Sequence, residues 1–281
     1  MAHTGQPSSN LIIPFASSLG EGCQAAIKKL SLPNLSQFLK AADLVREDNG
    51  DEFDFTPPHE RALGVTDQII VTPCHWRVGI DHIGMDNPAD LALHSDESQA
   101  LFETIRPYFL EDGIELKYAA PLRWYAQSHA LQGLELASLD RVIGRNVDVW
   151  QPQTDASKPI RRLQNEMQML LYTHLINDVR EAQGLPTVNS FWLSYEINLP
   201  VDEVTGLHND LRECTLRGDW ASWSNSWQAI DNKALQHIRQ ITLCGERNAH
   251  TYAIPATRNL GNIIRRLLKP APSIQSVLSA L

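Results

Sequence analysis

The segment from Arg161 to Ser194 constrains the fold more than any other part of the chain. Its first half repeats apolar residues every three or four positions, which predicts one amphipathic helix with a single buried face. Gly184 followed by Pro186 predicts the end of that helix. The β-branched and aromatic residues of 187–193 then predict a buried strand. The apolar residues of the helical face are Ile160, Leu163, Met167, Leu170, Leu171, Leu175 and Val179.

This pattern makes a specific prediction about the core. We expect Leu163, Met167, Leu170 and Leu171 to be buried, because they lie on the apolar face of the predicted helix. We also expect Trp192 to lie on a central strand of a sheet, because its neighbours are apolar on both sides.

Polar side chains interrupt the apolar pattern of the same segment. His174 and Asn177 are three positions apart and therefore share one face of a helix. A buried polar group without a hydrogen bond costs ~1–3 kcal/mol, so these residues must have partners. They either fasten the helix to the next strand or hold a ligand, and Arg180 is suited to carboxylate or phosphate oxygens. We take His174, Asn177, Arg180 and Asn189 as candidate ligand-binding residues.

Composition and charge narrow the class of protein. A hydrophobic content of 43% and a charged content of 20% are typical of a globular protein. The net charge of −9, without a basic cluster, argues against nucleic acid as a partner. No signal-peptide pattern and no apolar run long enough to span a membrane are present, so we expect a cytoplasmic protein without a membrane partner. Four scattered cysteines are then expected to be free thiols: Cys23, Cys74, Cys214 and Cys244.

The order of the predicted elements indicates an α/β protein with an insertion. The segment 47–58 is acidic and contains Gly and Pro, which is typical of a linker. We therefore expect a core formed by residues 1–50 and 150–281, with an inserted small α+β unit over 55–148. A last helix is predicted over 260–268.

Two further groups of residues could carry chemistry. The Gly/Ser loop of 17–22 follows an apolar run, as a phosphate-binding loop does, but it lacks the GxxxxGK[ST] pattern. His75, Asp81, His82 and Asp86 come close together, but neither HExxH nor a Cys/His framework is present. A solvent-exposed loop explains the second group equally well. We therefore predict neither a metal site nor a cofactor.

The central segment resembles a known family. The residues His174–Asn177, Arg180, Gly184 and Asn189–Leu193 resemble the "HPVN…R…G…N…W" stretch of archaeal-type cofactor-independent phosphoglycerate mutases. The chain as a whole resembles a set of bacterial regulatory proteins of the RpfE type (regulator of pathogenicity factors E). The motifs that carry this second resemblance are Asp86–Leu91, Arg123–Tyr125, Ile143–Arg145, Leu163–Leu171 and Leu243–Arg247.

The resemblance implies a reduced alkaline-phosphatase-like core, and it directs attention to two positions. Enzymes of that superfamily hold two divalent metals and a Ser or Thr nucleophile with Asp and His residues at strand ends. Where the first strand should deliver Asp, this chain has Pro14, and where a late strand should read Asp-His, it has Cys244-Gly245. Proline and glycine cannot ligate a metal through a side chain.

The expected function is therefore that of a degenerate phosphoglycerate-mutase-like protein, non-catalytic, with a regulatory or binding role. Its partner would be a phosphorylated small molecule or a regulatory protein. The alternative is an active metal-dependent phosphoglycerate mutase or phosphatase with a rearranged site. A third expectation is an interaction module without a ligand.

Overall fold

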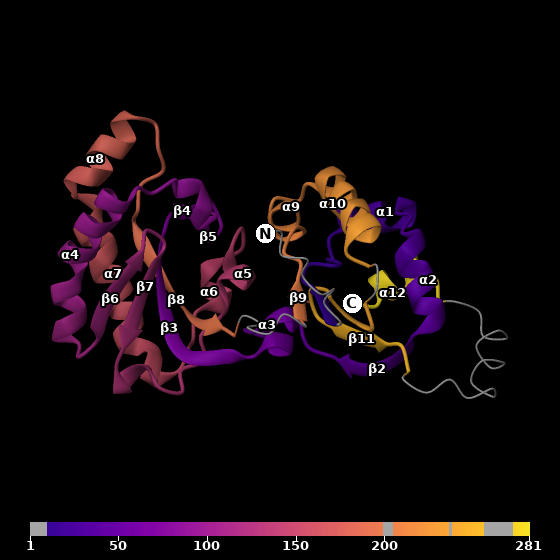
Figure 1. Cartoon of the computed structure of the whole chain (residues 1–281). Coiled ribbons are helices and arrows are strands. Elements are labelled where there is room, and N and C mark those ends of the chain that lie inside the picture. Colours follow the sequence, from indigo (N-terminus) through magenta and orange to yellow (C-terminus); the bar gives the residue numbers. More distant parts are fainter. Residues whose placement is uncertain (1–9, 199–204, 236–237, 256–271) are drawn as a thin grey trace, which may run out of the picture. The chain divides into compact units, whose positions relative to one another are not determined.

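The computed structural model shows a mixed α/β chain that divides into two compact units (Figure 1). Unit 1 comprises Met1–Gly64 and Leu199–Leu281, and unit 2 comprises Val65–Asn198. Among the residues described, no helix is both long and apolar enough to cross a membrane. The helix predicted over 260–268 falls outside them. The structure describes residues 10–198, 205–235, 238–255 and 272–281.

Unit 1 is built on a five-stranded sheet. Its strands are β1 (Asn10–Ile13), β2 (Asp43–Asp48), β9 (Thr205–Leu207), β10 (Gln240–Cys244) and β11 (Ala249–Ala253). They lie in the order β2-β11-β10-β1-β9. β1 pairs in parallel with both β10 and β9, whereas β11 and β2 continue the sheet in antiparallel pairs. The carboxyl ends of β9, β1 and β10 therefore meet at one edge of the sheet.

Helices complete the core of unit 1. Apolar residues of β1 and β10 pack with the buried faces of four helices into a single cluster, in which Trp223 and Trp227 are fully buried. The two indole rings meet edge to face at 6.3 Å between centroids. Those four helices are α1 (Glu21–Lys29), α2 (Pro33–Ala41), α10 (Trp220–Lys233) and α12 (Ile274–Ser279). Two short helices, α3 (Pro58–Leu63) and α9 (Arg212–Leu216), belong to the same unit.

Unit 2 contains a four-stranded antiparallel sheet and a small hairpin. The sheet is formed by β3 (Val65–Cys74), β6 (Glu115–Ala120), β7 (Arg123–Gln127) and β8 (Ser190–Ile197). Their order is β6-β7-β3-β8. The hairpin is formed by β4 (Trp76–Val78) and β5 (Ile83–Met85). Among the described strands, β3 and β8 share the longest pairing, although they are far apart in sequence.

The helices described in unit 2 are α4 (Ser95–Glu111), α5 (Leu139–Val142), α6 (Val147–Trp150), α7 (Lys158–Tyr172) and α8 (Leu175–Ala182). Of these, α4 and α7 bury their apolar faces against the four-stranded sheet. Leu163, Met167 and Leu171 on α7 are buried, as predicted, and Leu170 is partly buried. The prediction that Trp192 lies on a central strand is wrong, because β8 is an edge strand of the sheet. Its side chain is nevertheless buried, and its indole N–H donates to the Ala137 carbonyl.

The predicted single helix is in fact two helices. α7 ends at Tyr172, and α8 begins at Leu175 after a break at Thr173 and His174. His174 has an extended backbone, and its ring accepts a hydrogen bond from the Ile176 N–H, which caps α8. The apolar spacing continues across the break, but Leu175 and Val179 are exposed. The prediction from apolar periodicity alone therefore made the helix too long.

The division into units also differs from the predicted one. The segment 150–198, which we assigned to the core, belongs to unit 2. The reason is strand pairing, because β8 runs along β3 from Ile197 opposite Val65 to Ser190 opposite Cys74. The acidic segment 47–58 lies within unit 1, where Arg61 forms ion pairs with Asp48 and Asp54.

Two methionines on α7 test the assignment of its faces. Met167 has an exposed fraction of 0%, whereas Met169, two positions later, is 77% exposed. We expect Met167→Ala to lower the free energy of unfolding by ~2–5 kcal/mol, because it leaves a cavity in the core. The matched control Met169→Ala should change it by less than ~0.5 kcal/mol. Equal effects of the two substitutions in urea titrations would contradict the assignment.

Candidate functional site

The carboxyl edge of the sheet in unit 1 begins with a sharply bent loop. Phe15, two residues after β1, has a φ of 56°, a left-handed conformation that is uncommon for a residue other than glycine. Its carbonyl accepts a hydrogen bond of 3.0 Å from the indole N–H of Trp223, and the Ala16 carbonyl accepts one of 3.2 Å from Trp227. The Ala16 N–H donates to the Cys244 carbonyl at 2.8 Å. The loop is therefore held to both α10 and β10.

This loop places a hydroxyl against a carboxylate. Ser18 Oγ donates to Glu246 Oε2 at 2.9 Å, and the Leu19 N–H donates to the same oxygen at 2.9 Å. Glu246 follows β10, so the parallel pairing of β10 with β1 brings the two segments together. The sequence showed no carboxylate beside Ser18, because the two residues are 228 positions apart. The loop 17–22 therefore leads into the N-terminus of α1, as a phosphate-binding loop would. The group bound beside it is the Glu246 carboxylate of the chain itself.

The ends of the neighbouring strand and of α3 add two histidines to the same unit. His208 follows β9, its N–H donates to the Ile12 carbonyl at 3.0 Å, and its Nδ1 lies 3.0 Å from Asp210 Oδ2. The ring of His59 on α3 packs against Phe15 with 5.0 Å between ring centroids. Imidazole and carboxylate groups are thus present on unit 1. Within the described residues of unit 1 alone, however, no three His, Cys, Asp or Glu residues bring one ligand atom each within 4.8 Å of one another.

The structure leaves no space for a side chain at position 245. A Cβ atom built on Gly245 would lie 2.5 Å from Cβ of Leu281 and 2.7 Å from the Leu281 carbonyl oxygen. That oxygen accepts hydrogen bonds from the backbone N–H groups of Arg247 and Asn248 at 3.2 and 2.8 Å, which fixes Leu281 in place. The buried Leu281 therefore fills the space into which a residue at position 245 would project.

The two thiols near this edge of the sheet are protonated and therefore unreactive. Cys244 is completely buried, and burial strongly raises the pKa of its thiol. Burial also raises the pKa of Cys23 to about 11, with a smaller opposing effect of its hydrogen bond from the Ser18 N–H. Both groups are protonated near neutral pH, and the thiol is neither the nucleophile nor the metal-binding form of cysteine. All four cysteines are free, as predicted.

The structure places the four predicted ligand-binding residues at the junction of α7, α8 and β8 in unit 2. Asn177 is buried, and its amide group donates to the carbonyls of Leu171 and Val188 at 2.8 Å and accepts from the Val188 N–H at 2.9 Å. Asn189 accepts from the Trp76 N–H at 2.7 Å and donates to the Trp76 carbonyl at 2.9 Å. Both amides therefore join separate stretches of backbone.

Arg180 is the most deeply buried member of this group, with an exposed fraction of 0%. Its NH1 nitrogen lies 2.9 Å from both carboxylate oxygens of Glu97, and its Nε donates to the Pro186 carbonyl at 2.8 Å. NH2 donates to the Leu91 carbonyl. The guanidinium nitrogens therefore donate hydrogen bonds to α4, to the segment that precedes β8 and to the segment that precedes α4. A role in ligand binding stays a prediction for these residues, while their present contacts fasten the fold.

The predicted histidine group of the hairpin is spread out. His75 Nδ1 lies 2.8 Å from the Thr187 carbonyl, and Arg77 forms an ion pair with Asp86 at 3.3 Å. His82 is exposed at the turn between β4 and β5. Donor atoms of His75, Asp81, His82 and Asp86 do not gather as a group of three within 4.8 Å.

The pairing of Arg180 with Glu97 predicts a large effect on stability. Arg180→Met should lower the free energy of unfolding by ~3–5 kcal/mol, because it removes one partner of a largely buried ion pair. The control Arg106→Met breaks an exposed pair with Glu103 and should cost under ~1 kcal/mol. If Arg180→Met instead kept full stability and abolished binding of a phosphorylated ligand, the predicted binding role would be supported.

The cap of α8 predicts a dependence of stability on pH. Burial lowers the pKa of His174 below its ordinary value of 6.5, with a smaller opposing effect of Asp178. Nδ1 accepts from the Ile176 N–H, so Nε2 carries the proton and donates to Thr104 Oγ1 at 3.0 Å. Because the folded pKa is depressed, the unfolded chain binds more protons, and His174 stabilises the fold above pH 6.5 and progressively less below it.

The measurement is urea unfolding above and below that pH. His174→Asn keeps a capping oxygen and removes the titrating group, so it should reduce the loss of stability on acidification. His82→Asn, at an exposed histidine, serves as the matched control and should leave that loss unchanged. Identical pH profiles for wild type and His174→Asn would contradict the assigned role of the ring.

Comparison with known proteins gives limited guidance. The sequence matches no protein-family model and no curated protein. A solved structure of a cofactor-independent phosphoglycerate mutase from Thermoplasma acidophilum DSM 1728 is similar, with a TM-score of 0.36, 11% identity and coverage of 91% of this chain and 92% of that chain. The PH0037 protein from Pyrococcus horikoshii gives a TM-score of 0.42, 10% identity and coverage of 90% and 89%. Scores this low carry no conclusion about activity. The chain has a mixed α/β architecture with several sheets.

Proposed function

We propose that the chain is a degenerate phosphoglycerate-mutase-like protein that does not transfer phosphoryl groups and acts in regulation through binding. The observation that carries this proposal is the closure of position 245. In the superfamily that the sequence resembles, this position would carry a metal-binding histidine. Here any side chain would collide with Leu281, at 2.5 Å already for a Cβ atom.

The chemistry of two-metal phosphoryl transfer supports the proposal. It needs oxygen and imidazole ligands that converge on two ions ~3.5–4 Å apart, together with an activated nucleophile. At the carboxyl ends of β1 and β10, the chain has Pro14 and the pair Cys244-Gly245 instead. The buried thiol of Cys244 has a strongly raised pKa, so it does not replace a missing carboxylate.

The two partners expected from the sequence are not equally well supported. An anionic ligand would need free cationic groups or backbone N–H groups at a helix N-terminus. The N–H of Leu19 before α1 is taken by Glu246, and the guanidinium of Arg180 is taken by Glu97. Because the chain itself occupies these two donor groups, we propose a regulatory protein as the partner rather than a phosphorylated small molecule.

One observation favours a second candidate function. The hydroxyl of Ser18 donates to the carboxylate of Glu246, an arrangement of a nucleophile and a base. It would suit an active metal-dependent mutase or phosphatase with a rearranged site. The same carboxylate oxygen also accepts the Leu19 N–H, so Ser18 shares it with the backbone.

Turnover assays separate the two functions. We expect no interconversion of 2- and 3-phosphoglycerate and no hydrolysis of p-nitrophenyl phosphate with added Mn²⁺, Mg²⁺ or Zn²⁺. Ser18→Ala is the matched control, because any contaminating phosphatase would be equally active in both preparations. Metal-dependent turnover that disappears in Ser18→Ala would sink the proposal and establish the second candidate. Thermal shifts caused by phosphoglycerates but not by metals would restore the small molecule as the partner.

A further inference from the structure

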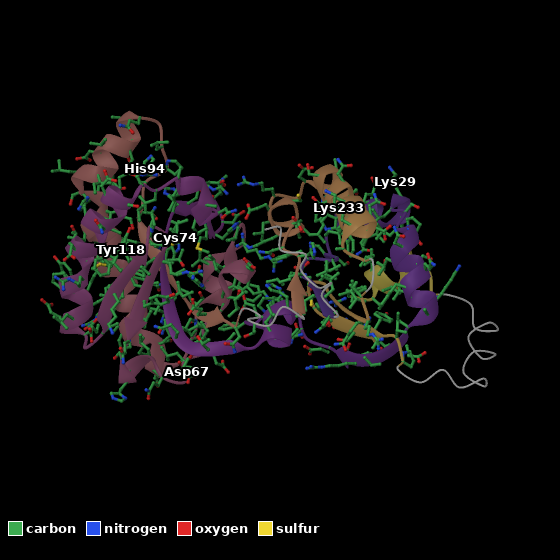
Figure 2. The ribbon with its side chains drawn as sticks, viewed as in Figure 1. Lys29, Asp67, Cys74, His94, Tyr118 and Lys233 are labelled. Atoms are coloured by element: carbon green, nitrogen blue, oxygen red, sulfur yellow. The ribbon has the colours of Figure 1, made fainter. Side chains whose placement is uncertain are left out.

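A cleft of about 530 Å³ lies in unit 2, where the regular pairing of β3 is interrupted. Val65 pairs with Ile197 on β8, and the next pair is Ile69 with Tyr195, so three residues of β3 oppose a single residue of β8. Such a bulge redirects the side chains of the extra residues. Its residues Asp67 and Gln68 line the cleft, and Asp67 lies near the lower end of β3 in Figure 2.

The floor of the cleft is apolar and fixed. Ile69, Ala126 and Leu131 line it and are buried in the core of unit 2. The partly buried ring of Tyr195 also lines it, and its hydroxyl donates to the Leu134 carbonyl at 2.8 Å. Burial, and to a lesser degree the charge of Asp67, raises the pKa of Tyr195, so the ring is neutral. A ligand would therefore meet a rigid apolar surface on this side.

The rim of the cleft carries neutral amides. Gln68, Gln127 and Gln132 line it, and their side chains form no hydrogen bond within the part of the chain that the structure describes. A carboxamide both donates and accepts, which matches the two capacities of a hydroxyl group. Asp67 adds an acceptor, and no Lys, Arg or His is among the lining residues. The cleft therefore offers no cationic side chain to balance the charge of a phosphate or carboxylate.

We infer that this cleft binds a neutral polyhydroxylated small molecule, such as a monosaccharide or cyclitol. The hydroxyls would bond to the three amides and to Asp67, while a C–H face would pack on Tyr195 and Ile69. The volume lies within the ~300–1,000 Å³ of small-molecule sites. The site belongs to unit 2 and shares no residue with the carboxyl edge of unit 1, so it does not depend on the proposed function.

The test is isothermal titration calorimetry of the full chain with D-glucose, D-galactose and myo-inositol. Inorganic phosphate and spermidine serve as anionic and cationic comparators. We expect at least one neutral compound to bind with a dissociation constant in the millimolar range or tighter, and neither comparator to bind at the cleft. Gln68→Ala and Gln127→Ala should each weaken that binding by about tenfold, because each removes one donor and one acceptor.

Matched variants keep the result interpretable. Gln99→Ala removes an exposed glutamine of α4 outside the cleft and should leave the affinity unchanged. Far-ultraviolet circular dichroism should show that all three variants are folded, because the substituted side chains are exposed. Failure of every neutral compound to bind, or binding that Gln68→Ala and Gln127→Ala leave intact, would overturn the inference. Preferential binding of phosphate or spermidine at these glutamines would overturn it as well. A negative result here leaves the turnover assays on unit 1 unaffected.

Discussion

The left-handed turn at Phe15 is the constraint on which the candidate site depends. A non-glycine residue with a positive φ is strained, and it persists only where the surroundings hold it. Here the indole N–H groups of Trp223 and Trp227 bind the carbonyls of Phe15 and Ala16, and both rings are fully buried. After the strained turn, the Ala16 N–H bonds to the Cys244 carbonyl at the end of β10, and Ser18 lies against Glu246.

Once the turn is fixed, the chain fills the edge of the sheet with its own groups. Glu246 accepts hydrogen bonds from Ser18 and from the Leu19 N–H, at a place where an external anion would otherwise be attracted by a helix N-terminus. Leu281 packs on Gly245 and excludes any side chain there. A sheet edge that is filled by the chain's own side chains is consistent with a protein that binds its partners through other surfaces. This filling is the physical basis of the non-catalytic role that we propose.

At the junction of α7, α8 and β8 in unit 2, buried polar residues fasten separate stretches of the chain to one another. Arg180 joins three stretches of chain, and Asn177 and Asn189 each bridge backbone that hydrophobic contacts alone would leave unpaired. Leaving such groups unsatisfied would cost ~1–3 kcal/mol each. This accounts for the polar side chains inside an otherwise apolar segment, which was one of the two explanations that the sequence allowed.

Sequence reasoning succeeded where the signal was local. The buried face of α7 at Leu163, Met167 and Leu171 follows from helical periodicity. The acidic strand β2 was missed, because its residues are mostly exposed at an edge of the sheet and only Leu44 and Val45 give an apolar signal.

The candidate site could not be predicted from the sequence, for a different reason. The contact of Ser18 with Glu246 and the packing of Leu281 on Gly245 join segments that are far apart in sequence. The parallel pairing of β1 with β10 brings Ser18 to Glu246, and parallel pairing leaves no short-range mark in a sequence.

We propose that the carboxyl edge of the sheet in unit 1 does not hold a divalent metal. Electron paramagnetic resonance of Mn²⁺ titrated into the full chain tests this directly, because bound Mn²⁺ loses the sharp signal of the free ion. We predict that wild type and Glu246→Gln give the same titration curve. Stoichiometric uptake of Mn²⁺ by the wild type that Glu246→Gln abolishes would contradict it.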